Sequence, residues 1–274
     1  MKQGLFILES ILSMKNNLKI AVYTCITGDY DTLIQPSNVD SRLDYFCFTD
    51  NDKQINSPWL LKSMTLPELD NKDKNRYVKM HPHIFFPDYD ITIYIDGNVG
   101  IVGDLYELAA EIHELEGCFF AYAHAERNCV YSEAAACGYF AHDWIWRIAK
   151  QMRKYSINNY PMNNGLVSAN ILIRKNNSAL VRLMDAWWSA YSSGVKRDQL
   201  SLPFVSWQHA ISITYLGKND FRYFQVVKHS IDTKPLKKRL RKHLDRAVTF
   251  VIPYQKLFAV PLAISRKKPF HTIN

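Results

Sequence analysis

Short apolar runs recur along the chain, and most of them end in a cluster of polar residues. The central run, Ile91–Ile95, is rich in isoleucine and stops at Asp96-Gly97-Asn98, after which the chain turns apolar again. Runs of this length, bounded by Pro or Gly, predict buried β-strands. Strands are predicted in the same way at residues 18–24, 45–49, 59–65, 119–124, 166–174, 222–227 and 248–252.

Longer segments with apolar residues three and four positions apart lie between these runs. After Asp104, a suitable N-cap, the residues Leu105, Leu108, Ile112 and Leu115 follow helical spacing. Helices are likewise predicted at residues 70–81, at 133–155, from Asn177 or Ser178 onward, and from Arg197-Asp198-Gln199 onward. Because strands alternate with helices, the sequence predicts an α/β fold with a mostly parallel central sheet.

The composition narrows the class of protein. No apolar run approaches the roughly 20 residues of a membrane-spanning helix, and no signal-peptide cleavage site follows the apolar stretch near the N-terminus. Five cysteines without metal-type spacing predict reduced thiols in an intracellular protein. We expect a leader at residues 1–17, one main domain at 18–230 and a C-terminal extension at 231–274.

The net charge of +8 is concentrated near the C-terminus. Residues 234–246 carry seven Lys and Arg against Asp245 alone, and Leu236, Leu240 and Leu244 are spaced four apart. As a helix, this segment would place three leucines on one stripe flanked by cations, which predicts peripheral contact with an anionic membrane. The alternative is that the leucines cover the main domain and the cations face water. Aromatic residues are not interleaved with the cations, which argues against nucleic acid as a partner.

Asp96 and Asn98 are candidate ligands of a divalent metal. Alternate positions of an extended chain face the same side, and Gly97 between them allows another group to approach closely. Two hard oxygen ligands at the carboxyl end of a buried strand suit Mg²⁺ or Mn²⁺ and, through the ion, a diphosphate. The alternative is a hairpin turn, which Asp-Gly between apolar runs also predicts. Polar clusters at residues 24–31, 49–51 and 124–127 also follow predicted strands, and this agreement favours the ligand site.

Further polar residues extend this pattern in order through roughly residues 20–210. The pieces are Tyr23-Thr24, Gly28-Asp29-Tyr30-Asp31, Phe48-Thr49-Asp50-Asn51, Asn75-Arg76 with Lys79, Tyr94-Ile95-Asp96-Gly97-Asn98, Arg127 with Tyr131 and Glu133, Gly165-Leu166 with Arg174, and Arg197-Asp198-Gln199-Leu200-Ser201. In this combination the sequence resembles a glycosyltransferase-like domain family, formerly a domain of unknown function, found in bacteria and in plant cell-wall proteins. It is also similar to the family-8 type galactosyl- and glucosyltransferases.

The resemblance implies a GT-A-like (Rossmann-like) nucleotide-diphospho-sugar transferase fold, a UDP-sugar or similar donor, and Mn²⁺ or Mg²⁺ as cofactor. It implies transfer to a glycan or lipid-linked acceptor in surface polysaccharide synthesis, such as bacterial lipopolysaccharide or capsule, with retention of configuration. The family-8 pattern has Asp-X-Asp and a late metal-binding His, and here Asn98 replaces the second Asp. His229 is the candidate for the late His, so the implied ligands are Asp96, Asn98 and His229.

The resemblance also implies roles for residues that would meet the donor. Donor cleavage leaves a nucleoside diphosphate, and Arg76 and Lys79 are the expected cations, with a solvated helix face as the alternative. Tyr23, Thr24 and Asp50 are expected at the base and ribose, with packing at the strand end as the alternative for Tyr23.

Catalytic candidates come from later in the chain. Asp198 or Glu133 is expected to act as nucleophile, base or orienting group, with surface ion pairs as the alternative. Gln199 and Asn164 supply hydrogen bonds suited to sugars and favour Asp198. Arg127 is expected to bind the phosphates or a sugar carboxylate, or else to pair with Glu133.

Two other functions stay open at this stage. A nucleotidyltransferase would also place a metal at such a strand end, but no Gly-rich phosphate loop with Arg and Lys lies near the N-terminus. A non-catalytic sugar-nucleotide-binding or scaffold protein with a decayed metal site is compatible with Asn98. The expected location is cytoplasmic, with peripheral contact at the inner face of the cell membrane.

Overall fold

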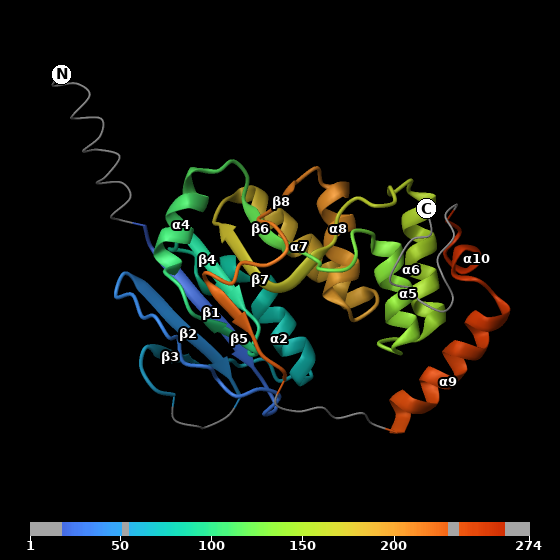
Figure 1. Ribbon diagram of the computed structural model, residues 1–274, viewed down its shortest axis with the longest axis horizontal. Coiled ribbons are helices and arrows are strands. Elements are labelled where there is room, and N and C mark those ends of the chain that lie inside the picture. Colours follow the sequence, from blue (N-terminus) through green and yellow to red (C-terminus); the bar gives the residue numbers. More distant parts are fainter. Residues whose placement is uncertain (1–17, 51–54, 230–235, 261–274) are drawn as a thin grey trace, which may run out of the picture. The chain divides into compact units, whose positions relative to one another are not determined.

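The apolar runs of the sequence form strands, and the amphipathic segments between them form helices. A computed structural model describes residues 18–50, 55–229 and 236–260 (Figure 1). The strands are β1 (Ile20–Ile26), β2 (Leu43–Thr49), β3 (Trp59–Lys62), β4 (Ile91–Ile95), β5 (Val99–Ile101), β6 (Phe119–Ala123), β7 (Val167–Lys175), β8 (Ile213–Tyr215) and β9 (Phe224–Val226). The helices are α2 (Asn71–Met80), α3 (Pro82–Phe85), α4 (Leu105–Glu114), α5 (Val130–Tyr139), α6 (Ile145–Ile157), α7 (Ser178–Ser193), α8 (Asp198–Gln208), α9 (Leu236–Val251) and α10 (Tyr254–Phe258).

A seven-stranded sheet has the order β3-β2-β1-β4-β7-β6-β8. β1 pairs in parallel with β2 and with β4, and β2 pairs in parallel with β3, whereas β7 is antiparallel to β4. Every residue of β1 and β4 is buried, as expected of strands covered on both faces. The predicted α/β fold with a mostly parallel central sheet is therefore confirmed.

The chain divides into two compact units. The first unit contains the chain up to Phe120 together with Asn170–Val181 and Asp220–Ile231. The second contains Ala121–Ala169, Arg182–Asn219 and the chain from Asp232 onward. The leader predicted at residues 1–17 lies outside the described residues, and the expected boundaries of the main domain stay predictions.

In the first unit, the Asp96-Gly97-Asn98 turn joins strands of two different sheets. β4 belongs to the large sheet, whereas β5 pairs antiparallel with β9, far along the chain (orange in Figure 1). The Val99 amide donates to the Asp96 carbonyl at 2.9 Å, so the segment is a tight turn. The turn of the alternative interpretation is therefore present, but it is not a hairpin, because β4 and β5 belong to different sheets.

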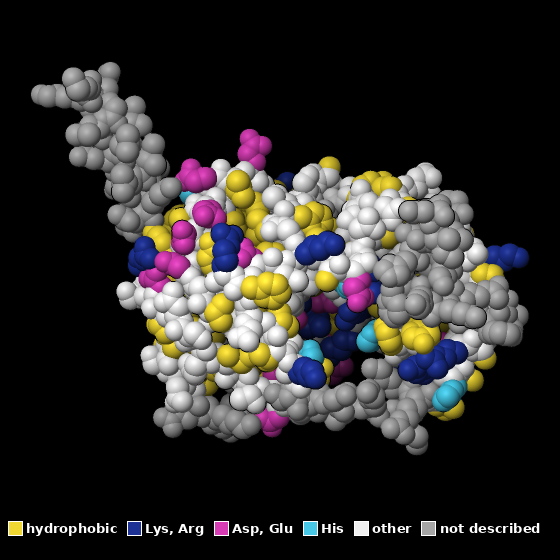
Figure 2. All heavy atoms as spheres, viewed as in Figure 1, with side chains coloured by type: hydrophobic (Ala, Val, Ile, Leu, Met, Phe, Trp, Pro, Cys, Tyr) yellow, Lys and Arg dark blue, Asp and Glu magenta, His cyan; other side chains and the backbone are white. Residues whose placement is uncertain are grey.

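The first unit also carries acidic side chains along one helix. Acidic side chains gather over α4, at the upper left of Figure 2. Glu107, Glu111 and Glu114 follow one another at helical spacing along α4, and Asp104 caps it by accepting from the Glu107 amide at 3.0 Å.

The second unit is mainly helical, and α5 packs against α6, α8 and α9. Two predictions were wrong here. The helix predicted at 133–155 is two helices, because Ala141 adopts a left-handed φ of 54° between α5 and α6. Of the strand predicted at 248–252, all but Ile252 form the end of α9, where the helical pattern of the preceding turns overrides the β-propensity of the β-branched residues. No helix in the described ranges is long and apolar enough to cross a bilayer.

Candidate functional site

The first unit brings a buried lysine to the carboxylate that ends β4. The Lys79 side chain is 1% exposed, and its Nζ lies 3.5 Å from Oδ1 of Asp96, which is 24% exposed. The Tyr94 hydroxyl donates to the same oxygen at 2.8 Å. Burial and the neighbouring Asp96 raise the pKa of Tyr94 well above its usual value, so the phenol stays a neutral donor. The carboxylate is therefore held from two sides and keeps an exposed edge.

Hydrogen bonds with β1 and β7 hold the end of α2 that carries Lys79. Asn75 donates from its amide to the Cys25 carbonyl of β1. Arg174 of β7 is fully buried and donates to the Lys79 carbonyl at 2.6 Å and to the Tyr23 hydroxyl. Arg174 therefore positions Lys79 and Tyr23, a role that the sequence did not predict. The sequence indicated Arg174 only as one of the residues that carry the family resemblance.

Tyr23 and Thr24 lie in the packed interior. Tyr23 is 0% exposed, and its ring packs against Tyr94 and Phe86. Its pKa is raised to about 12 by burial, against the opposing effect of Arg174. Thr24 is 2% exposed and its hydroxyl has no hydrogen-bond partner among the described residues. Tyr23 is thus placed as the alternative expected, with its ring packed in the interior at the strand.

Asp31 and His229 meet beside the turn after β4. His229 Nδ1 lies 3.0 and 3.1 Å from the two carboxylate oxygens of Asp31, which can only accept, so Nδ1–H is the donor. A Cβ at Gly97 would stand 3.2 Å from Asp31 Oδ2 and 2.9 Å from a side-chain carbon of Ile26, so a side chain at position 97 would collide. The glycine is therefore required by this close approach.

Asn98 fastens β9 to the turn. Its Nδ2 donates to the Val227 carbonyl at 2.8 Å, and the Val227 amide donates back to the Asn98 carbonyl at 2.9 Å. An aspartate could not donate this bond. The amide at position 98 thus has a structural use, and its Oδ1 is the atom that a metal would take.

The loop after β1 borders a cavity of about 260 Å³ in the first unit. The Gly28 amide donates to Asp50 Oδ1 at 2.9 Å, and the Thr27 hydroxyl donates to the Asn71 carbonyl at 2.6 Å. Asp31 and Thr49 line the cavity with the ends of β1 and β2. Its volume lies just below the range of about 300–1,000 Å³ for whole ligand sites, so it suits part of a ligand.

Arg76 lies one helical turn before Lys79 on α2. Its guanidinium donates to the Asn75 side-chain oxygen, and its positive charge opposes the rise in the pKa of Tyr94. Arg76 and Lys79 are therefore both near Tyr94, close to the end of β4. The two cations predicted on one face of α2 therefore lie close to the same tyrosine at the end of β4.

In the second unit, Glu133 is held between two arginines. Its Oε2 accepts from Arg127 Nε at 2.7 Å, and its Oε1 accepts from Arg197 at 3.2 Å. Burial alone would raise the pKa of Glu133, but Arg197 and Arg127 outweigh it and the pKa is lowered. Burial and Arg127 lower the pKa of His124, whose Nε2 lies 2.9 Å from Arg127. At neutral pH the cluster holds a carboxylate, a neutral imidazole and two cations.

Asp198 and Gln199 occupy the first turn of α8, next to Arg197. Asp198 is 3% exposed, and its Oδ1 accepts from the Gln199 amide at 3.1 Å. The Gln199 side chain donates to the Val167 carbonyl at 2.9 Å, which ties α8 to β7. Asn164 lines a separate cavity of about 430 Å³ with residues of α8 and β8.

The donor set at Asp96 fits a hard divalent cation. Carboxylate, amide oxygen and imidazole are ligands for Mg²⁺ or Mn²⁺, and ligating histidines usually donate their second ring N–H to a carboxylate, as His229 does to Asp31. No preformed group of three His, Cys, Asp or Glu side chains suited to a metal occurs within residues 18–50, 55–229 and 236–260. Asn98 is not one of these four residue types, so a site that uses its amide oxygen is not counted among such groups.

Comparisons with known proteins point to one family. The model of the family described as "TOD1/MUCI70, glycosyltransferase-like domain" matches residues 2–229. No curated protein matches the chain. Among solved structures, the chain is similar to mouse xyloside xylosyltransferase 1 in its apo form. The TM-score is 0.46 at 8% identity, over 73% of this chain and 85% of that one.

Proposed function

The chain belongs to the TOD1/MUCI70 glycosyltransferase-like domain family, and from this premise we propose that it is a glycosyltransferase of GT-A type. The donor is a nucleotide-diphosphate sugar such as a UDP-sugar, and the acceptor is a glycan or a lipid-linked glycan. The observation that carries the proposal is the carboxylate of Asp96, held at the carboxyl end of β4 beside the buried cation of Lys79. Ligands of open α/β sheets bind at this edge.

The first unit supplies the donor site in this proposal. The cavity bordered by Asp31 and Thr49 takes part of the nucleoside, and Asp50, which holds the Gly28 amide, borders the ribose. Donor cleavage leaves a nucleoside diphosphate with growing negative charge, which fixed cations stabilise in the transition state. Arg76 and Lys79 are the fixed cations, and their position is set before the donor arrives because Arg174 and Asn75 hold α2.

We infer that Mn²⁺ or Mg²⁺ assists the reaction. Asp96, Asn98 through Oδ1, and His229 through Nε2 would hold the ion, with Asp31 orienting the imidazole. When bound, the ion would neutralise charge on the leaving diphosphate. Asn98 lowers the negative charge of this ligand set by one relative to a second Asp, so the expected affinity is modest and Lys79 shares the task of neutralisation.

The second unit supplies the groups for sugar and acceptor. Glu133 is saturated by Arg127, Arg197 and the thiol of Cys137, so we assign it to orienting the two arginines. Asp198 is the carboxylate proposed to act on the anomeric carbon or the acceptor hydroxyl, with retention of configuration. Gln199 places Asp198 by tying the start of α8 to β7.

The acceptor class suggests a place of action. We propose that the protein works in the cytoplasm and contacts the inner face of the membrane when its acceptor is lipid-linked, as in surface polysaccharide synthesis. The support is α9, where Leu240 and Leu244 are 62% and 49% exposed. Arg241, on the same helix, faces the protein, because its guanidinium donates a hydrogen bond to the Ala141 carbonyl. The alternative, in which the leucines cover the main domain and the cations face water, stays open.

The side chains of Leu236, Lys237, Lys238 and Arg239 lie outside the described part of the chain, as does Lys234 entirely. The stripe of three leucines is thus described for its last two members. The basic character of the segment is nonetheless a property of the sequence, where seven Lys and Arg fall within residues 234–246.

Donor hydrolysis tests the function. Purified protein is screened by thermal shift against UDP-, GDP-, ADP- and CMP-sugars with Mn²⁺, and each hit is incubated without acceptor to detect the released nucleotide. A glycosyltransferase should slowly release nucleoside diphosphate from one donor, and Asp198→Asn should reduce that rate far more than donor affinity. Binding of a donor without any hydrolysis or transfer would instead support the non-catalytic sugar-nucleotide-binding function.

A further inference from the structure

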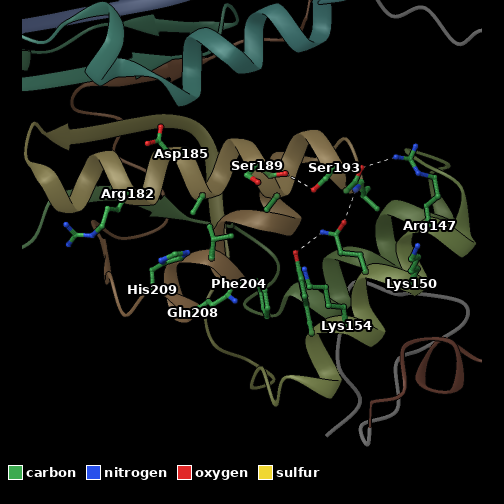
Figure 3. A pocket seen from close by; sticks show the side chains of 17 residues that line it. Arg147, Lys150, Lys154, Arg182, Asp185, Ser189, Ser193, Phe204, Gln208 and His209 are labelled. Atoms are coloured by element: carbon green, nitrogen blue, oxygen red, sulfur yellow. Dashed lines mark hydrogen bonds between the residues drawn. The ribbon is translucent and has the colours of Figure 1, made fainter.

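A second hollow, distinct from the donor cavity in composition, lies wholly within the second unit. It has a volume of about 900 Å³ and is lined by one face each of α6, α7 and α8 (Figure 3). This volume is near the upper end of the range of about 300–1,000 Å³ for ligand sites. We call it the basic groove, defined by Arg147, Lys150 and Lys154 of α6, Arg182 of α7, and Tyr155 and Phe204 at its floor.

The groove exists because most of the side chains of α7 that line it are small. The face of α7 that lines it carries small residues, among them Ala186, Ser189, Ala190 and Ser193. The opposite face of α7 carries large buried residues such as Trp187. Small side chains on one wall leave the space that a ligand would fill.

The floor is rigid. The rings of Tyr155 and Phe204 are stacked with centroids 3.9 Å apart and planes 7° apart, and both residues are buried. Gln151 donates to the Tyr155 hydroxyl at 2.8 Å and accepts from the Val195 amide at 2.8 Å. The shape of the groove is therefore set before any ligand binds, which favours affinity.

The charged side chains that line the groove are mostly positive. Arg147, Lys150 and Lys154 lie at i, i+3 and i+7, on one face of α6, and Figure 3 shows them toward one end with Arg182 toward the other. Asp185 is the one carboxylate among the described residues that line the groove. The side chains of Lys150, Lys154 and Arg182 have no ion-pair or hydrogen-bond partner within the described residues.

Like charges at this spacing destabilise a helix, and α6 contains no acidic residue to offset them. Arg147 is the best-held cation, since it donates to the Gly194 carbonyl at 2.9 Å and pairs with Asp143 at 3.3 Å. A guanidinium fixed in this way keeps further N–H donors for a planar anion. Cations gathered around a preformed hollow indicate an anionic ligand.

From these observations we propose that the basic groove binds an anionic glycan, namely the part of the acceptor that carries carboxylate or phosphate groups. Cations at both ends suit a chain with charges on more than one sugar. The hydroxyls of Ser189 and Ser193 and the amide of Gln208 suit sugar hydroxyls between them. The stacked rings are buried and cannot take up bases, which argues against single-stranded nucleic acid. The assignment to an acceptor rests on the proposed function, whereas the binding of an acidic glycan does not.

Calorimetric titration of the full chain tests the groove. The probes are a tetrauronate, the same oligosaccharide fully methyl-esterified, and an otherwise uncharged oligosaccharide carrying one sugar phosphate. The tetrauronate or the phosphorylated probe should bind at least tenfold more tightly than the methyl ester, and the affinity should fall as salt is raised. Whichever acidic probe binds identifies carboxylate or phosphate as the group recognised. Equal binding of acid and ester, or no binding of either acidic probe, would overturn the proposal.

Matched variants locate the binding. Lys150→Gln/Lys154→Gln should lose at least tenfold in affinity for the acidic probe, whereas Lys218→Gln/Lys256→Gln, which removes the same charge from exposed positions outside the groove, should not. Equal loss in both variants would mean a general charge effect and overturn the proposal. Arg182→Gln, at the other end, repeats the test if the α6 variant fails to fold. Donor hydrolysis without acceptor should be unchanged in the groove variants, so failure of the groove and failure of the enzyme are distinguishable.

Discussion

At the scale of single residues, the pair Asp96 and Lys79 is the most exacting feature of the donor site. Asp96→Asn keeps the shape and an acceptor for the Tyr94 hydroxyl but removes the charge, so we predict a loss of transfer of about 10²–10³-fold with the fold retained. Asp96→Ala should in addition lose about 3 kcal/mol of unfolding free energy, because the ammonium of Lys79 is left buried without its carboxylate. Transfer kinetics and urea unfolding measure the two effects.

The double variant Asp96→Ala/Lys79→Met is the control for this prediction. Removing both charges should restore much of the stability lost in Asp96→Ala without restoring activity, because a buried charge is no longer uncompensated. Full activity in Asp96→Asn would contradict the assignment of this carboxylate to the reaction.

Asn98 provides a second prediction at this scale. On the sequence alone, Asn98→Asp should tighten Mn²⁺ binding by adding a charge. The structure predicts a cost as well, since the new carboxylate would face the Val227 carbonyl 2.8 Å away with no proton to donate. We expect the unfolding free energy to fall by about 1–3 kcal/mol. Thermal and urea unfolding at neutral pH, against the exposed Asn219→Asp as control, measure this; equal stability of both variants would mean that the amide bond is dispensable.

The site residues differ in how far the sequence could predict them. The strand-end pattern indicated Asp96 and Asn98, whereas His229 came from the family resemblance, and Lys79 does lie at the carboxylate. The part played by Arg174 could not be predicted, because a buried arginine in a strand shows its partners only in three dimensions. Tyr23 shows the opposite problem, since a tyrosine at a strand end has the same pattern whether it meets a ligand or the core.

At the scale of elements, the junction of α9 with α6 depends on one carboxyl group. Asp245 is 1% exposed, its Oδ1 accepts from the Ile145 amide at 3.3 Å, and its Oδ2 has no hydrogen-bond partner among the described residues. Burial raises the pKa of Asp245 to about 6 from its usual 3.8. The folded state therefore favours the protonated acid, and the stability that it contributes at low pH is lost as the pH rises through about 6.

Asp245→Asn should remove this loss. The amide oxygen can still accept from Ile145 and no charge is buried, so we expect the variant to be more stable than the parent at pH 7.5 by on the order of 2 kcal/mol. The difference should shrink toward pH 4. Urea unfolding across this range tests it, with the exposed Glu116→Gln as control; a difference that does not depend on pH would contradict the raised pKa.

Most elements could be predicted, and the misses have physical causes. Strands β1, β2, β4 and β6 lie where apolar runs ended in polar clusters, because local pattern and burial agree there. Gly138, in the last turn of α5, is the one residue of a type that signals the break between α5 and α6, and the left-handed conformation is taken by Ala141 instead. The three-residue strand β8 carries too short a pattern to be recognised.

At the scale of the whole molecule, the order of strands and the partners of β5 lay beyond sequence reasoning. Pairing of β5 with β9 joins segments far apart in the chain, and nothing local in either segment indicates the other. The class of fold was predictable because alternation of strands and helices is a property of the chain as a whole. The same holds for charge: the sequence shows where cations concentrate, and the structure shows which of them have partners.

The uneven charge of the molecule leads to a last prediction, on membranes. Two exposed leucines and a strongly basic segment on α9 should bind vesicles containing anionic lipid, where each nearby Lys or Arg contributes about 1 kcal/mol. Leu240→Ser/Leu244→Ser should reduce co-sedimentation several-fold, whereas Ile157→Ser, at a more exposed apolar position on α6, should not. Binding should need anionic lipid and fall between tens and hundreds of millimolar salt, because screening shortens the range of attraction. If replacing Lys237, Lys238, Arg239, Arg241 and Lys242 by Gln leaves sedimentation unchanged, α9 does not dock on membranes, and its exposed leucines need another partner.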